Sequence, residues 1–279
     1  MAEHLGAGYH VAVAVLRPLL MLATRRDWRG AENLPATGGF VVTPNHVSHV
    51  DPIVVSHFLH DNGRPPRFLA KSGLFTLPVV GWVVRSAGQI PVFRESRNAT
   101  AAFAGAVAAI EAGECVAIYP EGTLTRDPSL WPMVAKTGAA RVALTTGCPV
   151  IPIAQWGAQR ILAPYTKRPH LLGRKVMHVT AGPPVDLEDL RGRPITSELL
   201  RVATERIMAR VTAHLVDVRG EAPPAEVFDA RAAGLTLMGK PQRITPDAPV
   251  PPGAGSDPRQ SPNPDRLGTD ELSAEGSTQ

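Results

Sequence analysis

The sequence predicts an α/β fold: a single domain whose central sheet is largely parallel and is flanked by helices. Through residues 40–155, short apolar runs alternate with helical patterns, which is the order that parallel strands joined by crossover helices produce. The chain has 279 residues, of which 44% are hydrophobic, so it is long enough to bury a sizeable core. Its composition changes near residue 241, where proline becomes frequent. These observations predict one folded domain followed by a tail.

Four segments are predicted along the chain. Residues 1–30 form an apolar or amphipathic helical segment, residues 31–220 the α/β domain, residues 221–240 a C-terminal extension, and residues 241–279 a disordered tail. The tail has eight prolines in 39 residues and no aromatic residue. Such a segment cannot bury enough apolar surface to offset the entropy lost on ordering.

The charge of the chain is unevenly distributed. The net charge is +4, but residues 241–279 contain three arginines against six acidic residues, which gives −3 there and +7 elsewhere. A basic folded part suits an anionic partner, such as a phosphorylated substrate, an acidic lipid headgroup or a nucleic acid. The basic residues are scattered and not interleaved with aromatic residues, which argues against nucleic acid.

Residues 9–23 are mostly apolar and are predicted to be helical, although Arg17 and Pro18 interrupt them. The run is shorter than the roughly 20 apolar residues that span a bilayer, and it lacks the basic leader of a signal peptide. A helix lying in the membrane interface fits, with Trp28 and the neighbouring arginines close to lipid headgroups. An equal alternative is a helix packed on the protein's own core.

The remaining elements follow from local patterns. Apolar runs predict strands at residues 40–42, 67–70, 90–93, 114–119, 150–154 and 175–180. Helical patterns predict helices at residues 52–59, 74–84, 98–112, 136–146 and 196–217. The last helix is amphipathic, with a predicted core stripe of Leu199, Leu200, Val202, Ile207 and Val211.

Residues 74–84 are almost wholly apolar. We expect a helix that belongs to the core, since that is the usual place for such a segment. The functional alternatives are an apolar wall for a bound apolar chain and a face that dips into lipid.

A histidine and an aspartate flank the turn between the first strand of the α/β domain and the following helix. His46 and Asp51 are five residues apart, which would place their side chains roughly 140° apart on a straight helix. They can meet if His46 lies in the turn before the helix, and Pro52 favours a helix that starts there. A neutral imidazole is a usable general base near pH 7, and a carboxylate on its other nitrogen fixes the tautomer.

Two other interpretations fit the same stretch. Asp51 could serve as an N-cap of the helix, which would need no catalytic histidine. Alternatively, five potential ligands crowd this region and could bind a metal ion: His46, His49, Asp51, His57 and His60. Alternate residues before a helix rarely converge on one ion, and no second carboxylate or cysteine cluster supports a metal site. We therefore expect none.

Four sequence blocks resemble, in their order, the signature of the glycerolipid acyltransferases, especially the 1-acylglycerol-3-phosphate acyltransferases. The first is Asn45-His46-x-Ser48-x-x-Asp51, a His-x4-Asp motif. The others are the sequences GQIPVFR at residues 88–94, YPEGT at residues 119–123 and PVIPI at residues 149–153. Four ordered blocks across residues 40–155 are far more specific than one short motif.

The resemblance implies a role for each matching residue. His46 would be the catalytic base and Asp51 its partner, while Asn45 and Ser48 would support the motif. Substrate binding would involve Lys71, Arg94, Glu121, Gly122 and Thr123. An arginine suits a phosphate because its planar fork gives two hydrogen bonds, although Arg94 could instead pair with Glu95.

Two of these assignments have alternatives in the sequence itself. Glu121 could accept a hydrogen bond from an acceptor hydroxyl or could simply order the turn after its strand. The family usually has arginine directly after the threonine of the third block. This chain has Leu124 there and its next arginine is Arg126, which leaves the second phosphate contact open.

The implied reaction is direct acyl transfer to a hydroxyl of lysophosphatidic acid, without a cofactor. The acyl thioester, carried by coenzyme A or acyl-carrier protein, would be a co-substrate. The protein would work at the cytoplasmic face of the cell membrane, embedded in its interface or peripheral to it. Other acceptors, the donor's carrier and chain length, and the oligomeric state stay open. A rival of another class is a non-catalytic lipid-binding protein, which the basic body and apolar segments would suit.

Overall fold

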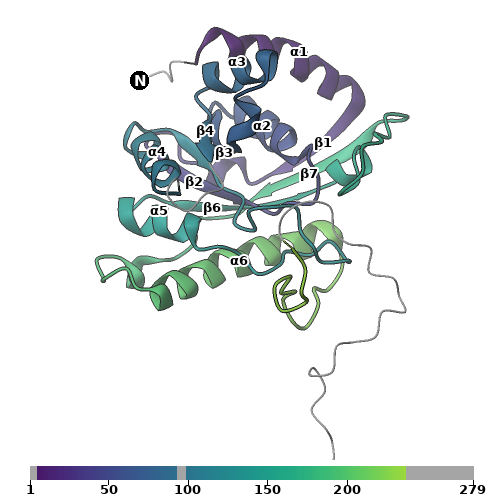
Figure 1. Ribbon diagram of the computed structural model, residues 1–279. Coiled ribbons are helices and arrows are strands. Elements are labelled where there is room, and N and C mark those ends of the chain that lie inside the picture. The colour runs from purple at the N-terminus through teal and green to yellow at the C-terminus, as the bar shows by residue number, and fades with distance from the viewer. Residues whose placement is uncertain (1–4, 93–98, 237–279) are drawn as a thin grey trace, which may run out of the picture. The chain divides into compact units, whose positions relative to one another are not determined.

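The computed structural model describes residues 5–92 and 99–236 of the chain (Figure 1). The tail predicted at residues 241–279 and the last part of the C-terminal extension lie outside the described residues. So does Arg94, the predicted phosphate contact of the second block.

The core is a seven-stranded sheet with the order β1-β7-β6-β2-β5-β3-β4. Its strands are β1 (Thr24–Arg29), β2 (Phe40–Pro44), β3 (Pro66–Lys71), β4 (Ile90–Val92), β5 (Cys115–Ala117), β6 (Val150–Trp156) and β7 (Lys175–Ala181). Neighbouring strands run parallel except β6 and β7, which are antiparallel. The prediction of an α/β fold with a largely parallel sheet is therefore confirmed.

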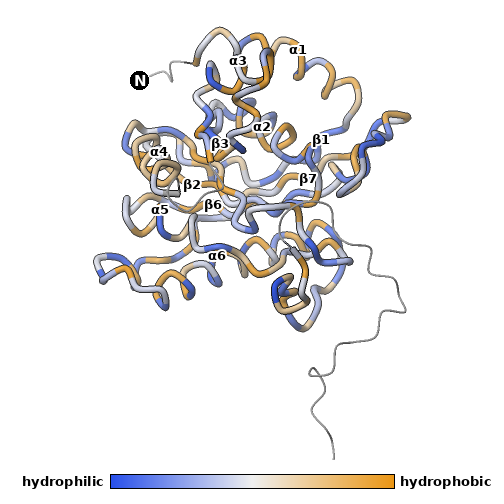
Figure 2. The backbone as a smooth tube through the Cα atoms, in the orientation of Figure 1, coloured by the Kyte–Doolittle hydropathy of each residue, from blue (hydrophilic) through white to orange (hydrophobic). Residues whose placement is uncertain are grey.

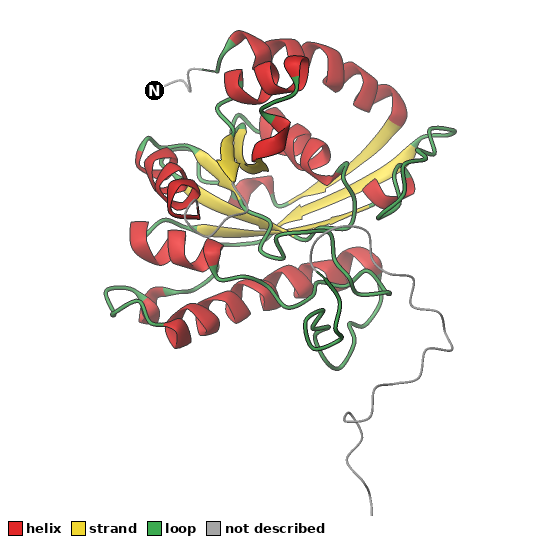
Figure 3. Ribbon diagram, viewed as in Figure 1, coloured by secondary structure: helices red, strands yellow, loops and turns green. Residues whose placement is uncertain are grey.

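Helices cover both faces of this sheet (Figures 1 and 3). They are α1 (Ala7–Ala23), α2 (Asp51–Asp61), α3 (Pro78–Ser86), α4 (Ala99–Glu111), α5 (Gly138–Thr146) and α6 (Ser197–Arg219). One core cluster joins the sheet to α4, α5 and α6, and a second joins its other face to α2. In Figure 1, α1 and α3 lie on the same side of the sheet as α2.

Strand β2 lies in the middle of the sheet, between β5 and β6. Successive side chains of a strand point to opposite faces, so Val41 enters the cluster with α4, α5 and α6, while Phe40 and Val42 enter the cluster with α2. This double burial explains the continuous apolar run in the sequence.

Helix α6 carries clear start and stop signals. The Thr196 hydroxyl accepts a hydrogen bond from Leu199 N–H at 3.1 Å, and Gly220 ends the helix with a left-handed φ of 67°. Of the predicted core stripe, Leu199, Leu200, Ile207 and Val211 are buried, and Val202 is partly buried against the same cluster. The stripe is confirmed.

The N-terminal helix ends at Ala23, and residues 24–29 form β1, although the sequence analysis left them in a helical segment reaching residue 30. Strand β1 is an edge strand that pairs with β7 alone. Its Trp28 packs edge-on against the rings of His57 and Phe58, with centroids 4.9 and 5.5 Å away. The indole therefore packs against side chains of α2. This differs from the position near lipid headgroups that the interfacial-helix interpretation gave it.

The prediction that residues 74–84 form a core helix is wrong. Helix α3 starts at Pro78, and its apolar side chains face outward, with Val79 74% and Trp82 45% exposed. Helix α1 is similar: Leu19 and Leu22 are 57% and 75% exposed, and only Gly8 and Tyr9 are among its buried residues. The two helices pack on each other, and Figure 2 shows hydrophobic colour along both.

Polar contacts attach α1 to α2. The Tyr9 hydroxyl lies 2.6 Å from His60 Nδ1, and Arg17 pairs with Asp61 at 2.9 Å. Arg26 of β1 reaches the same carboxylate at 3.1 Å. Within residues 5–92 and 99–236, none of the helices combines the length and the hydropathy that crossing a bilayer requires.

Candidate active site

The topology brings two of the sequence blocks to one edge of the sheet. Strands β2 and β5 are parallel neighbours, so their carboxyl ends lie at the same edge. His46 follows β2, and Glu121 follows β5. Crevices at this edge are the usual ligand sites of open α/β sheets.

His46 and Asp51 are in direct contact. His46 Nδ1 lies 2.9 Å from Asp51 Oδ2, and the same oxygen accepts hydrogen bonds from the N–H groups of Val47 and Ser48 at 2.6 and 2.7 Å. Asp51 is the first residue of α2, and the capping position before it is Val50, which makes no side-chain cap bond. Asp51 is thus not the N-cap that the alternative interpretation required; it folds the preceding loop back so that His46 reaches it.

The imidazole is held in one orientation. Its ring stacks on the ring of Tyr119 at a centroid distance of 4.1 Å and an interplanar angle of 27°. With Nδ1 directed at Asp51, Nε2 is the nitrogen available to a substrate, and the side chain is 14% exposed. Burial raises the pKa of the Asp51 carboxyl, while the hydrogen bonds from His46, Ser48 and Val47 oppose that rise.

Glu121 links the His46 loop to the segment after β5. The residue is 1% exposed; its Oε1 accepts the His46 N–H at 3.0 Å, and its Oε2 accepts the Met133 N–H at 3.1 Å. Burial raises the pKa of Glu121 to about 8. Both oxygens already have backbone donors, which favours the turn-ordering interpretation over contact with an acceptor hydroxyl.

Asn45 and Ser48 fix the ends of the same loop. Asn45 exchanges three hydrogen bonds with Gln155 of β6: Asn45 Nδ2 to Gln155 O at 3.1 Å, Gln155 N to Asn45 Oδ1 at 2.8 Å, and Gln155 Nε2 to Asn45 O at 2.9 Å. The Ser48 hydroxyl donates to Leu162 O at 2.7 Å and accepts from Val50 N–H. The sequence analysis missed Gln155, since the only signal is its place near the end of a strand adjacent to β2.

The predicted substrate-binding residues make fewer contacts with the His46 loop than Asp51, Asn45 and Ser48 do. Lys71 is exposed at the carboxyl end of β3, and no hydrogen bond or ion pair among the described residues joins it to the His46 loop. Gly122 has a left-handed φ of 70°, and its N–H donates to Tyr119 O at 3.0 Å, so this amide is not available to an anion. Thr123 is half-buried beside it.

Arg126 does not offer an exposed cation in place of the leucine at position 124. The residue is 6% exposed, and its guanidinium lies 4.5 Å from the centre of the Tyr165 ring. The Tyr165 hydroxyl in turn donates to the carbonyls of Leu124 and Thr125, each at 2.8 Å. Arg126 is therefore enclosed beneath a tyrosine that is tied to its own loop.

The histidines that could have formed a metal site lie in different parts of the structure. His46 contacts Asp51, His60 contacts Tyr9 of α1, and His57 packs against Trp28. Over the ranges that the structure describes, no group of three or more histidine, cysteine or acidic side chains is placed to hold a metal ion.

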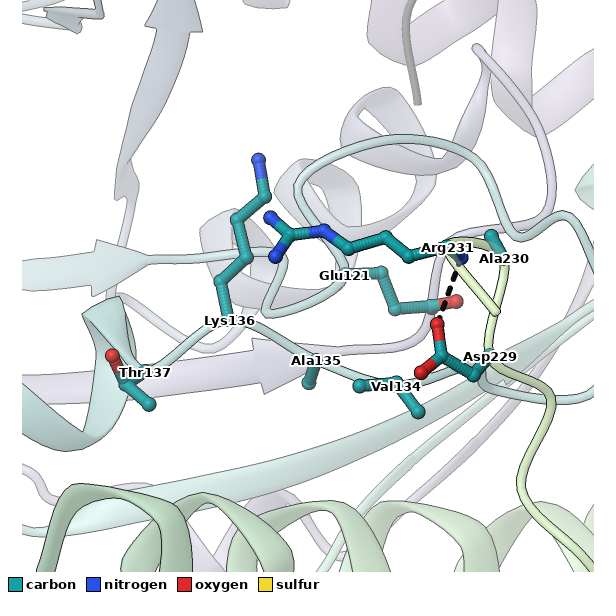
Figure 4. Close-up of a pocket in the computed structure, with 8 residues that line it drawn as sticks. All are labelled: Glu121, Val134, Ala135, Lys136, Thr137, Asp229, Ala230 and Arg231. Atoms are coloured by element: carbon teal, nitrogen blue, oxygen red, sulfur yellow. Dashed lines mark hydrogen bonds between the residues drawn. The ribbon is translucent and has the colours of Figure 1, made fainter. Parts of the chain in front are cut away.

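A cavity of about 360 Å³ adjoins Glu121 (Figure 4). It is lined by Glu121, Val134, Ala135, Lys136, Thr137, Asp229, Ala230 and Arg231. The C-terminal extension thus contributes side chains next to the third sequence block. The sequence analysis did not find Lys136 and Arg231, because 95 positions separate them.

Several known proteins with similar sequences are acyltransferases by name. Residues 25–156 match the family model described as Acyltransferase. A chloroplastic 1-acyl-sn-glycerol-3-phosphate acyltransferase of Brassica napus is 33% identical over 140 residues, which cover 50% of this chain and 39% of that protein. The enzyme of the same name from Borreliella burgdorferi is 34% identical over 44% of this chain and 48% of its own length. Its namesake from Bacillus subtilis is 26% identical over 73% of this chain and 94% of its own.

The fold also has a solved counterpart. The crystal structure of the 1-acyl-sn-glycerophosphate acyltransferase PlsC from Thermotoga maritima superposes with a TM-score of 0.60 and 21% identity, covering 77% of this chain and 81% of that one. The chain spans less than half the length of the Brassica and Borreliella proteins. The resemblance that the four sequence blocks predicted is confirmed: residues 25–156, which contain all four blocks, match the acyltransferase family model, and the similar Brassica and Borreliella proteins are acyltransferases by name.

Proposed function

We propose that this chain transfers an acyl group from an acyl thioester to the free hydroxyl of lysophosphatidic acid, forming phosphatidic acid. The observation that carries the proposal is the 2.9 Å contact between His46 Nδ1 and Asp51 Oδ2, which leaves Nε2 for the substrate. The names of the similar proteins from Brassica, Borreliella and Bacillus support this acceptor.

The chemical step requires one proton transfer and one substitution. His46 Nε2 takes the proton of the acceptor hydroxyl, and that oxygen attacks the thioester carbonyl. The tetrahedral intermediate then collapses, the C–S bond breaks, and the imidazolium returns the proton to the leaving thiolate. Asp51 holds His46 in the required tautomer and stabilises the imidazolium while it exists. No nucleophilic serine or cysteine takes part.

The proposal is tested with the purified full chain, lysophosphatidic acid and one acyl-CoA. The expected product is phosphatidic acid, measured together with release of the thiol. Glycerol-3-phosphate, other lysophospholipids and a glycolipid form the comparison panel, and acyl-carrier protein replaces coenzyme A in a second series. Thioester turnover that yields only free fatty acid, or no turnover with any acceptor, would contradict the proposal and favour the non-catalytic lipid-binding alternative.

The proposal places the enzyme at the cytoplasmic face of the membrane, where acyl thioesters and lysophospholipids meet. The support is the outward apolar surface of α1 and α3, to which Leu19, Leu22, Val79 and Trp82 belong. Side chains of this kind lying in the interface bind a membrane through buried apolar area, and the basic charge of residues 1–240 adds attraction to anionic lipid.

Replacing Leu19 and Leu22 together with aspartate is expected to lower binding to vesicles that contain anionic lipid by at least about tenfold, because a buried leucine contributes about 1.5–3 kcal/mol. Co-sedimentation of the full chain measures the effect. Ile195→Asp is the matched control, since Ile195 is an exposed aliphatic residue just before α6, on the opposite side of the sheet. Sedimentation of the double variant equal to that of wild type would show that α1 does not contact lipid.

A further inference from the structure

We infer that Lys136, Arg231 and the N-terminus of α5 form a subsite for a phosphate group of a substrate, built in part by the C-terminal extension. The inference rests on the proposed function only for the identity of that substrate. Its physical basis is the cavity beside Glu121, whose lining includes Lys136, Arg231 and Thr137 at the start of α5.

The two cationic side chains come from distant parts of the chain and extend toward the same region. Figure 4 shows Lys136 and Arg231 rising on the same side of the cavity, with the guanidinium beside the lysine stem. Lys136 lies across Gly122, because a Cβ at position 122 would be 2.9 Å from Lys136 Nζ. The glycine of the third block therefore makes room for this lysine.

The extension that carries Arg231 is fixed against the loop after β5. Val134 N–H donates to Phe228 O at 2.9 Å. Asp229 Oδ1 accepts the N–H groups of Arg231 and Ala232 at 2.8 and 3.2 Å, which shapes the turn that presents Arg231. These contacts hold the backbone from which the Arg231 side chain extends.

Neither cation has a carboxylate partner in the part of the chain that the structure describes. By contrast, Arg201 of α6 pairs with Glu198 and Glu205, and Arg206 pairs with Asp189. Two like charges that face one cavity repel each other, and an anion between them turns that repulsion into attraction. A phosphate, with its charge and several acceptor oxygens, suits a lysine and a forked guanidinium together.

The start of α5 adds a third positive element. Thr137, the N-cap residue, lines the cavity and makes no side-chain cap bond, so the first N–H groups of this nine-residue helix lack a side-chain acceptor from it. The N-terminus of a helix attracts anions through these N–H groups and the helix dipole.

The acidic residues in the lining do not cancel this charge. Glu121 Oε1 and Oε2 are occupied by the N–H groups of His46 and Met133, and its pKa of about 8 leaves it mostly uncharged at pH 7. Asp229 keeps its single negative charge, with Oδ1 holding its own turn, so the two cations in the lining outnumber it. Through Glu121 the subsite is also joined to the backbone of His46, the residue that would react.

The test uses the full chain with Lys136→Ala and Arg231→Ala, and with Lys136→Arg and Arg231→Lys as conservative partners. Both native side chains are exposed, so their removal leaves the core intact. Arg210→Ala is the matched control, because Arg210 is an exposed arginine of α6 outside the cavity. Binding of inorganic phosphate, followed by ³¹P NMR at constant ionic strength, is expected to weaken about tenfold or more in each alanine variant and to stay unchanged in the control.

Steady-state kinetics then identify the source of the phosphate. A rise of about tenfold in KM for lysophosphatidic acid, with kcat within twofold and KM for a monoacylglycerol unchanged, assigns the subsite to the acceptor. A rise in KM for acyl-CoA but not for a phosphate-free acyl thioester assigns it to the donor. Unchanged phosphate binding and unchanged KM values in the alanine variants would overturn the inference while leaving the proposed function standing. If the protein binds phosphate through Lys136 and Arg231 but transfers no acyl group, the inference stands and the proposed function is overturned.

Discussion

Replacing His46 with alanine is expected to lower kcat for acyl transfer by about 10²–10⁴-fold, which is the usual contribution of a positioned general base. The imidazole contacts Asp51 through Nδ1 and offers Nε2 to the acceptor, so the substitution removes the proposed proton acceptor. The melting temperature should change little, because the His46 backbone N–H still donates to Glu121. The rate of phosphatidic acid formation at saturating substrate is the measurement.

Two variants make this result specific. His49→Ala removes an exposed histidine from the same loop and should leave kcat near the wild-type value. Asp51→Asn keeps an oxygen for the Val47 and Ser48 N–H groups but removes the charge that stabilises the imidazolium, so kcat should fall about 10²-fold or more. Near-normal turnover in His46→Ala would rule out the proposed chemistry.

Protein stability is expected to fall by a few kcal/mol as the pH rises from about 5 to about 8, owing to Glu121. Burial raises the pKa of this carboxyl from 4.5 to about 8 on folding, so the folded state binds the proton more tightly than the unfolded chain. The free energy that this adds is fully present below pH 4.5 and is lost as the pH rises through about 8. The measurement is the unfolding free energy from urea titrations at several pH values.

Glu121→Gln should flatten that dependence. The variant loses some stability at low pH, roughly 1–3 kcal/mol, because the amide nitrogen cannot accept the N–H of His46 or Met133. Above pH 8 its disadvantage should shrink or reverse. Glu111→Gln, on the exposed side of α4, is the control and should follow the wild-type curve. Parallel curves for wild type and Glu121→Gln would show that Glu121 does not titrate in this range.

Local patterns were enough to predict most of the sheet and the layers around it, but not its edge. Strand β1 has the sequence TRRDWR, which has neither an apolar run nor a clear alternation, because an edge strand buries little. Its partner β7 begins at Lys175, about 150 residues later, so nothing nearby in the sequence indicates the pairing. The helix at α3 was predicted but its exposure was not, because an apolar sequence does not reveal whether the protein's own core covers it.

The candidate site was likewise predictable only in part. His46 and Asp51 lie five residues apart across the turn before α2, so their spacing allowed the contact, and the resemblance of the four blocks implied it. The bonds of Glu121 to His46 and Met133 depend on β2 and β5 being neighbours, which the sequence alone does not state. Lys136 and Arg231 meet only through the folding of the C-terminal extension, and neither residue belongs to a recognisable motif.

Under the proposed function, helix α2 bears on the depth at which acyl transfer would take place. Its first residue, Asp51, orients the reactive imidazole, and its last residue, Asp61, anchors both Arg17 of α1 and Arg26 of β1. A helix of 11 residues rises about 16 Å and is stiff along its axis. It therefore acts as a spacer of constant length between α1 and the reactive nitrogen. Whatever surface α1 rests on, an acceptor must project its hydroxyl by a matching height, which would select lipids by the reach of the headgroup as well as by its charge.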